Sequence, residues 1–284
     1  MKKIGFIGVG VMGQPMVKHL KNNGYEVSIY TRTKEKVLPL LDEGIIWHDS
    51  IKECIKDKDV IMSMVGYPKD VEEIYFGENG IIENAKEGSL LIDFTTSSPR
   101  LARQIYEQAK KKKLDSLDAP VSGGDIGAKN ATLSIMVGGE QDVYQKAYPL
   151  FKVLGSTINY CGPSGSGQHI KMTNQIAIAG TIAGVCEAIT YGENAKLDLD
   201  IMMKCICNGA AGSWQLTNNG QNILNQNFNP GFYIKHFIKD MKIAKEEMEE
   251  AGIHLEVLDK VLKMYQSLNE DELGTQALIH YYQK

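Results

Sequence analysis

The stretch KIGFIGVGVMGQPM, residues 3–16, decides the expected fold of this chain. It runs from a short apolar segment, expected to be a strand, through Gly8, Gly10 and Gly13 into an expected helix over residues 11–24. In such a turn the first glycine permits the tight bend, the second lets a pyrophosphate approach the backbone, and the third allows close helix–strand packing. The helix N-terminus adds N–H donors for phosphate groups. Because strand and helix accompany the glycines, we interpret the segment as a dinucleotide-binding turn, with a turn that binds no ligand as the weaker alternative.

The same rhythm of apolar runs and helical segments continues through the first half of the chain. Almost wholly apolar runs of this kind are typical of parallel strands covered on both faces. Ser98 followed by Pro99 is a typical helix start, while Pro39 lies unexplained inside an expected helix over residues 34–44. The pattern predicts an α/β fold, with a Rossmann-type doubly wound sheet over residues 1–161. The expected strands lie at 3–10, 26–31, 59–65, 89–95, 114–121 and 132–139.

The pattern changes after about residue 160. GPSGSG, residues 162–167, is a glycine-rich break, and the sequence from His169 to about Lys196 predicts one helix of roughly 40 Å. No convincing strand pattern follows. Residues 162–284 are therefore expected to form an all-α domain that begins with a long interdomain helix. Small residues on that helix favour close packing, so we expect a homodimer or homotetramer formed through this domain.

Composition excludes several function classes. The 31 basic and 35 acidic side chains nearly balance, which argues against a nucleic-acid partner. No apolar run is long enough to span a bilayer, so we expect no membrane association. The five cysteines form no CxxC pair, which favours a reducing, cytoplasmic compartment. The histidines show no ligand spacing, so no metal is expected.

The end of the second expected strand bears on the choice of cofactor. It reads Tyr30-Thr31-Arg32-Thr33 and has no carboxylate that could bind the ribose hydroxyls of NAD. Arg32 is placed to pair with a 2′-phosphate, with Thr33 and Lys36 as further donors. The pattern favours NADP(H) and leaves NAD(H) possible, because Arg32 could instead stack on the adenine and admit both cofactors.

The candidate catalytic residues follow the glycine-rich break. Lys171 is expected in the first turn of the long helix, and Asn174 and Gln175 share its face. A lysine near a helix N-terminus is locally unfavourable, and the same dipole should make its proton easier to lose. A solvated surface lysine is the usual alternative. The amide pair and the glycine-rich lead-in favour an acid/base role.

A second candidate segment is DAPVSGG, residues 118–124, at the carboxyl end of an expected strand. Ligands bind at this edge of open α/β sheets. Ser122, with the N–H groups of Gly123 and Gly124, could form a nest that binds a carboxylate. An ordinary turn is the alternative for this segment taken alone.

Taken together, these motifs resemble the β-hydroxyacid dehydrogenase family, which includes 3-hydroxyisobutyrate dehydrogenase and tartronate semialdehyde reductase. The resemblance covers nearly the whole chain and keeps the family's order of motifs. These motifs are GFIGVGVMGQPM (5–16), DAPVSGG (118–124), the lysine segment (162–175) and NFNPGFYIKHFIKDM (227–241).

The resemblance implies a set of site residues. Lys171 matches the catalytic lysine, and Ser122, Gly123 and Gly124 match the segment that holds the substrate carboxylate. Lys239 and Asp240 match a further motif whose lysine reaches the cofactor cleft, and both are expected to contribute to substrate binding. The cofactor-binding positions implied here are Gly8, Gly10, Val11, Met12, Gly13, Thr31, Arg32, Thr33, Lys36, Val65, Gly66, Thr96 and Lys239.

Some residues depart from the pattern of the family. Gln175 stands where 3-hydroxyisobutyrate dehydrogenases usually have asparagine, and the Asn174–Gln175 pair is more like tartronate semialdehyde reductases. Gly66 stands where many members have proline, and AAGSWQL (210–216) resembles a less characterised branch. These departures leave the substrate open, whereas the expected reaction is hydride transfer between a nicotinamide and a small hydroxy acid or semialdehyde.

Two other functions remain as alternatives. An imine reductase would share the architecture, but such enzymes usually have an acidic or aromatic residue at the place of Lys171. A non-catalytic dinucleotide-binding protein would be expected to lack Lys171 or the Ser122–Gly124 segment, and both are present.

Overall fold

The computed structural model describes residues 2–283, and the chain divides into two compact units. We call Met1–Lys171 the sheet unit and Met172–Lys284 the helical unit. Their boundary lies inside the long helix α9 (Ser166–Asn194), further along the chain than the expected division after residue 161. The first part of α9 groups with the sheet unit because hydrogen bonds described below tie it to two strand ends.

The described part of the sheet unit contains one sheet of nine strands, in the order β3-β2-β1-β4-β5-β6-β8-β7, with β9 beside β8. Strands β3 to β6 pair in parallel in the order 3-2-1-4-5-6, which is that of a Rossmann-type sheet. The order reverses between β1 and β4, and ligands of such sheets bind beyond the strand ends at this point. These strands are β1 (Lys3–Ile7), β2 (Glu26–Tyr30), β3 (Ile46–Trp47), β4 (Val60–Ser63), β5 (Leu90–Asp93) and β6 (Asp115–Asp118).

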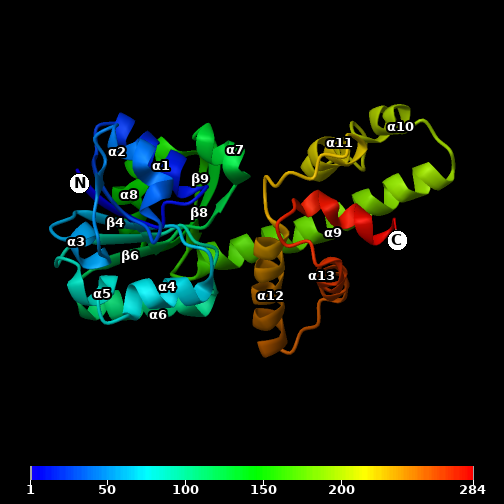
Figure 1. Ribbon diagram of the computed structural model, residues 1–284. Coiled ribbons are helices and arrows are strands. Elements are labelled where there is room, and N and C mark those ends of the chain that lie inside the picture. Colours follow the sequence, from blue (N-terminus) through cyan, green and yellow to red (C-terminus); the bar gives the residue numbers. More distant parts are fainter. Residues whose placement is uncertain (1, 284) are drawn as a thin grey trace. The chain divides into compact units, whose positions relative to one another are not determined.

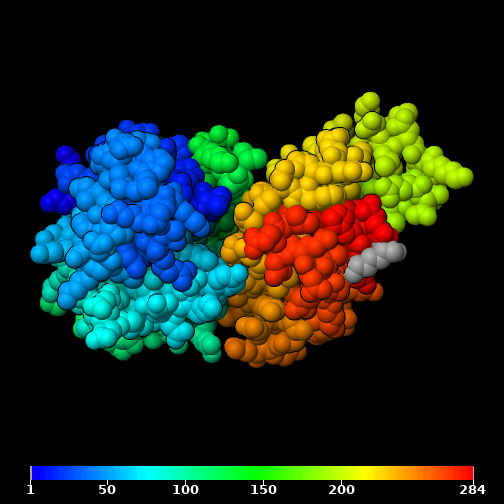
Figure 2. Space-filling model, viewed as in Figure 1, coloured from blue at the N-terminus to red at the C-terminus, as the bar shows by residue number. Residues whose placement is uncertain are grey.

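Helices cover both faces of this sheet, as expected from its apolar strands (Figure 1). Helices α1 (Gly13–Asn22) and α8 (Gln141–Leu154) pack on one face, over a core that includes Phe6, Ile29 and Phe151. Helices α3 (Ile51–Ile55), α4 (Pro68–Phe76) and α6 (Pro99–Lys111) pack on the other face. Ser98 caps α6 by accepting a hydrogen bond from the N–H of Leu101 at 3.1 Å, as its sequence predicts. In the space-filling view, the blue and cyan segments form a continuous packed surface (Figure 2).

Several elements differ from the sequence-based expectation. The expected helix over residues 34–44 is a 3₁₀ turn, η1 (Lys34–Val37), followed by the short helix α2 (Leu38–Leu41). Pro39 lies in the first turn of α2, where its missing N–H costs nothing. Strand β3 and strand β9 (Gly155–Gly162) were not expected, because β3 is very short and much of β9 is exposed and polar. The segment 114–121 forms β6 and the start of β7 (Val121–Ser122), and β8 (Leu133–Gly139) pairs antiparallel with both.

In its described part, the helical unit has no strand, as the sequence predicts, apart from a single bridge between Tyr233 and Gly274. Its core is built around Ile189, Phe237 and Tyr265. None of the helices described is long and apolar enough to cross a membrane. After α9 come α10 (Leu199–Ile206), a π-helix η2 (Gln215–Gly220), α11 (Gln221–Leu224), α12 (Ile234–Glu250), α13 (Glu256–Leu268) and a 3₁₀ helix η3 (Thr275–Tyr281).

Candidate active site

The turn between β1 and α1 contains three glycines, and at each of them the absence of a side chain matters for a different physical reason. Gly8 has φ +89°, and a Cβ there would lie 2.3 Å from the carbonyl oxygen of Met64. A Cβ on Gly13 would lie 2.4 Å from the carbonyl oxygen of Gly8, so only glycine lets α1 pack this close to the strand. Gly10 has no neighbour within 4 Å of its Cβ position, so its backbone is open to a ligand. Val11, beside it, is 57% exposed, and Met12 is half-buried.

Beyond β2, the side chains expected to bind the adenosine end are accessible. Arg32, Thr33 and Lys36 are exposed, and Thr31 is half-buried. Arg32 forms an ion pair with Asp70 in the first turn of α4, because its Nη2 lies 3.4 Å from Oδ1 of Asp70. A carboxylate is therefore present in this region, but it comes from a different strand–helix connection than the one the sequence motif specifies.

The connections after β4 and β5 are tied together at the expected nicotinamide side. The N–H of Val65 donates to Oγ1 of Thr95 at 3.0 Å. Oδ1 of Asp93 accepts from the hydroxyl of Ser63 at 2.8 Å and from the N–H of Thr95 at 3.1 Å. Burial raises the pKa of Asp93 to about 6, against the effect of these hydrogen bonds. Gly66 and Thr96, the other expected residues here, are half-buried.

The expected carboxylate nest follows β7 directly. Ser122 is the last residue of β7 and is half-buried. Gly123 has φ +125° and Gly124 has φ +61°, two successive positions in conformations that side chains other than glycine rarely adopt. The two glycines turn the backbone sharply from β7 into α7 (Gly124–Lys129), and this bend leaves Ser122 at its rim.

The start of α9 is held by Asp118 and Gln168, which we call the α9 clamp. Asp118, at the end of β6, accepts hydrogen bonds from the N–H groups of Gly165 at 2.8 Å and Gln168 at 3.0 Å. A carboxylate there satisfies N–H groups that a helix start leaves unpaired, and it complements the helix dipole. The Gln168 side chain is fully buried; it accepts from the N–H of Ser97 at 2.9 Å and donates to the carbonyl of Thr95 at 2.8 Å. The clamp therefore fixes α9 to the ends of both β5 and β6.

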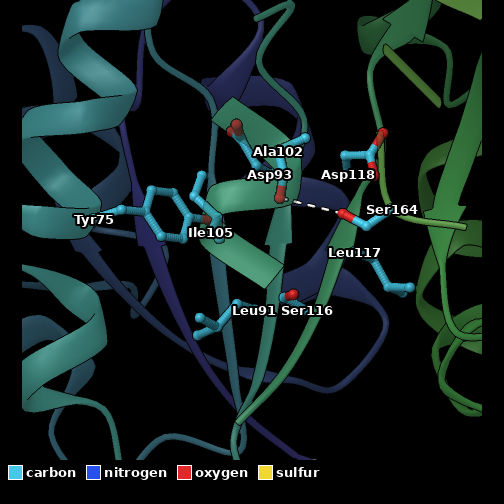
Figure 3. Close-up of a pocket in the computed structure, with 9 residues that line it drawn as sticks. All are labelled: Tyr75, Leu91, Asp93, Ala102, Ile105, Ser116, Leu117, Asp118 and Ser164. Carbon is cyan, nitrogen blue, oxygen red and sulfur yellow. Dashed lines mark hydrogen bonds between the residues drawn. The ribbon is translucent and has the colours of Figure 1, made fainter. Parts of the chain in front are cut away.

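A small cavity of about 10 Å³ lies beside the clamp, lined by Asp93 and Asp118 from adjacent strands (Figure 3). Ser164 closes one side, and its hydroxyl donates to the carbonyl oxygen of Ala102 at 3.2 Å. Burial raises the pKa of Asp118, while backbone hydrogen bonds act in the other direction. The cavity holds at most a water-sized group, so it is part of the support of the site and not a substrate pocket.

Lys171 is only 6% exposed, which separates it from an ordinary solvated lysine. Because α9 begins at Ser166 and not at His169, Lys171 lies in the second turn and not in the first. The dipole effect falls off within one turn, so the effect of the helix dipole on Lys171 is weaker than its sequence position suggests. Lys171 also lies one helical turn after Gln168, so the clamp fixes the backbone that presents it.

Within the helical unit, the two amides that follow Lys171 belong to a chain of hydrogen bonds. Nδ2 of Asn174 donates to Oε1 of Gln175 at 2.7 Å, and Nε2 of Gln175 donates to Oδ2 of Asp240 at 2.7 Å. Nζ of Lys239 lies 3.0 Å from the other oxygen of Asp240. Gln175 and Asp240 are each 1% exposed. These contacts join four of the expected residues. The hydrogen bond from Asn174 to Gln175 fixes the orientation of the Asn174 amide.

Sequence patterns did not assign roles to three residues of this region. Asp118 was part of the quoted motif, but its partners at Gly165 and Gln168 lie 47 and 50 residues further along the chain, so no local pattern indicates its role. Gln168 gave no signal, because its partners at Thr95 and Ser97 are distant in sequence. Asp70 is a typical first-turn acid of a helix, and nothing in the sequence connects it with Arg32.

Comparisons with known proteins identify the family of both parts of the chain. Residues 3–162 match the family model described as the NAD binding domain of 6-phosphogluconate dehydrogenase. Residues 165–282 match the model described as NAD-binding of NADP-dependent 3-hydroxyisobutyrate dehydrogenase. Together the two models span both units.

Individual proteins show the same likeness over most of their length. An uncharacterized oxidoreductase of Bacillus subtilis is 55% identical, over 98% of this chain and 97% of its own. The 2-hydroxy-3-oxopropionate reductase of Escherichia coli is 35% identical, over 89% of this chain and 86% of its own. Among solved structures, the 3-hydroxyisobutyrate dehydrogenase of Mycobacterium tuberculosis with L-serine has a TM-score of 0.93 and 27% identity, and each chain is covered completely.

Proposed function

We propose, for a chain that belongs to the β-hydroxyacid dehydrogenase family of NAD(P)-dependent oxidoreductases, that it interconverts a short β-hydroxy acid and the corresponding semialdehyde. NADP(H) is the preferred cofactor and NAD(H) is accepted. The observation that supports this most is Lys171: a buried lysine, on a helix start fixed to two strand ends and followed by an ordered amide pair. A surface lysine would need none of these supports.

In this proposal Lys171 is the acid/base. The nicotinamide, when bound, supplies or accepts the hydride. In reduction, the ammonium group of Lys171 donates a proton to the carbonyl oxygen as it becomes a hydroxyl, and in oxidation the neutral amine takes that proton back. Asn174 holds the lysine or the substrate oxygen, in an orientation set by Gln175 and, through it, by Asp240 and Lys239.

Ser122, Gly123 and Gly124 bind the carboxylate of the substrate in this proposal. The bend after β7 is built on two glycines with positive φ, and a hydroxyl lies at its rim. Fixing the carboxylate places the carbonyl at a defined distance from it, which contributes orientation to catalysis. The relative from E. coli supports a short acid, because 2-hydroxy-3-oxopropionate is a three-carbon acid with an aldehyde carbonyl.

The residues around the first turn fit a dinucleotide. Gly10 leaves open space where a pyrophosphate would lie against the N-terminus of α1. Val11, Met12, Val65, Gly66 and Thr96 complete the cofactor side of the proposal. The exposed Arg32 would pair with the 2′-phosphate of NADP, supported by Thr31, Thr33 and Lys36. A cytoplasmic location accords with the free thiols of the described cysteines, among them Cys205 and Cys207.

A substrate panel tests the proposal. Purified protein is given NADPH or NADH with short semialdehydes, such as 2-hydroxy-3-oxopropionate and methylmalonate semialdehyde, and with cyclic imines as the competing class. We expect turnover of a semialdehyde that bears a carboxylate and a higher kcat/KM with NADPH. Turnover of imines alone, or tight NADPH binding without any turnover, would contradict the proposal.

The Lys171→Ala variant tests the assigned acid/base. We expect kcat to fall by about 10²–10⁴-fold, the usual range for general acid–base catalysis, while the NADPH dissociation constant stays the same. Lys152→Ala, which removes an exposed lysine of α8, is the matched control. Near-normal turnover by Lys171→Ala would show that another group moves the proton.

A further inference from the structure

The carboxylate of Asp70 lies beside the cation expected to recognise the 2′-phosphate. Oδ1 of Asp70 is 3.4 Å from Nη2 of Arg32. The two side chains come from different connections: Arg32 follows β2, whereas Asp70 belongs to the first turn of α4. The site therefore combines a cation that favours a phosphate with a carboxylate, the group that binds ribose hydroxyls in NAD sites.

Asp70 is fixed in this place by its own helix. Its second oxygen, Oδ2, accepts a hydrogen bond from the N–H of Tyr67 at 3.0 Å, and Pro68 begins the helix between them. Only 7% of the residue is exposed, and a carboxylate in the first turn is stabilised by the helix dipole. The Arg32 side chain, in contrast, is 75% exposed and attached to a flexible stem. Arg32 can turn toward an incoming phosphate, but Asp70 stays where it is.

Two other cations follow β2 in η1, Lys34 and Lys36. Nζ of Lys34 lies 4.1 Å from the centre of the Trp47 ring, where it makes a cation–π contact. Lys36 is exposed, and its carbonyl oxygen accepts a hydrogen bond from Gln14. Because Asp70 lies 3.4 Å from Arg32, a 2′-phosphate bound by Arg32 would also lie near the Asp70 carboxylate, whose negative charge repels the phosphate at short range.

We propose that Asp70 is a specificity-determining residue, which lowers the preference for NADP(H) and lets the enzyme use NAD(H) as well. The proposal rests on the proposed function, in which Arg32 contacts the 2′-phosphate. Asp70 offsets part of the attraction of Arg32 for the phosphate, and its carboxylate favours a ribose that bears a hydroxyl.

The Asp70→Asn variant tests this inference without any substrate. Its amide oxygen still accepts the hydrogen bond from Tyr67, so the start of α4 is preserved while the charge is removed. The dissociation constants of NADPH and NADH are measured by fluorescence titration for the wild type and the variant. We expect the ratio of the NADH constant to the NADPH constant to rise at least fivefold. Glu72→Gln, which removes an exposed carboxylate from the same helix, should leave the ratio within twofold of the wild type.

The ratio separates specificity from a folding defect, because partial unfolding weakens the binding of both cofactors equally. An unchanged or lower ratio in Asp70→Asn would overturn the inference. If that variant does not fold, Asp70→Ser, whose hydroxyl can accept the same N–H, is read by the same criterion. The Arg32→Ala variant shows whether a failure concerns the role of Asp70 or the proposed contact between Arg32 and the 2′-phosphate. A fall of its ratio below the wild-type value supports the phosphate contact, and an unchanged ratio rejects the assigned role of Arg32 itself.

Discussion

Asp93 shows how a single buried carboxyl group can support the loops of a site at a cost in stability. Desolvation raises its pKa from 3.8 to about 6, although Ser63 and Thr95 donate hydrogen bonds to it. Between these two pKa values, the folded state binds more protons at this position than the unfolded state does. The contribution of Asp93 to the free energy of unfolding therefore decreases as the pH rises from about 4 to about 6.

The Asp93→Asn variant is expected to remove this pH dependence. Asparagine keeps an oxygen that accepts from Ser63 and Thr95 but does not ionise. Urea unfolding at pH 4.5 and pH 7.5 gives the free energy of unfolding of both proteins. Wild-type stability should fall between these two pH values, and in the variant we expect this loss to be smaller by about 2 kcal/mol, at about 1.4 kcal/mol per pKa unit. Equal pH dependence in both proteins would show that the pKa of Asp93 is not raised in the folded state.

Single residues also show what a sequence pattern can assign. The close helix–strand packing expected at Gly13 is confirmed, because it depends on the carbonyl of Gly8 only a few residues away. The cofactor contacts expected of Gly8, Gly10 and Gly13 stay predictions. The roles of Arg32 and Asp70 depend on a pair that two different connections bring together. No local pattern could reveal this pair, because the absence of a carboxylate at the end of the second strand says nothing about a carboxylate in the first turn of α4.

The α9 clamp holds the start of the helix that carries Lys171. Asp118 and Gln168 bind the start of α9 to the ends of β6 and β5, and the sheet fixes these two strands. The connection after β5 also includes Thr96, which is proposed to contact the cofactor. A change at the clamp should therefore alter the geometry of proton and hydride transfer more than it alters the binding of either ligand.

Gln168→Met is expected to show this. The buried N–H of Ser97 and carbonyl of Thr95 lose their partner, which should lower the free energy of unfolding by about 1–3 kcal/mol. We expect kcat to fall at least tenfold, since a displacement of about 1 Å in an active site can cost about 10²-fold, while the NADPH dissociation constant changes little. With C4-deuterated NADPH, the isotope effect on kcat should increase as hydride transfer becomes slower.

The matched control is Ser50→Ala. Ser50 caps α3 by accepting from the N–H of Glu53 at 3.2 Å, and its loss should cost about 1 kcal/mol of stability without a change in turnover. If Gln168→Met lowers kcat only in proportion to its folded fraction, with an unchanged isotope effect, the clamp is a structural support and does not position Lys171.

For the whole molecule, we expect assembly through the helical unit. Its described residues include several large apolar side chains that remain exposed, among them Tyr191 at 73%, Trp214 at 63% and Ile201 at 57%. Exposed apolar surface of this kind is often an interface. Sedimentation velocity at micromolar concentration should give a dimer or tetramer, and the Ile201→Lys/Trp214→Ala variant should shift it toward monomer. A monomeric wild type would contradict the expectation.

The sequence by itself determined the Rossmann-type sheet, the all-α second part and the family, because these rest on local periodicity and on motifs whose parts are close in the chain. It also marked Lys171, Asn174, Gln175 and the Ser122–Gly124 bend as candidates. Only the tertiary structure shows that α9, the helix of Lys171, starts at Ser166, next to a hydrogen bond from the N–H of Gly165 to the Asp118 carboxylate. Only the tertiary structure shows that the Asp70 carboxylate lies beside Arg32. These contacts join residues far apart in sequence, so they exist only once the sheet has brought the strand ends to one edge.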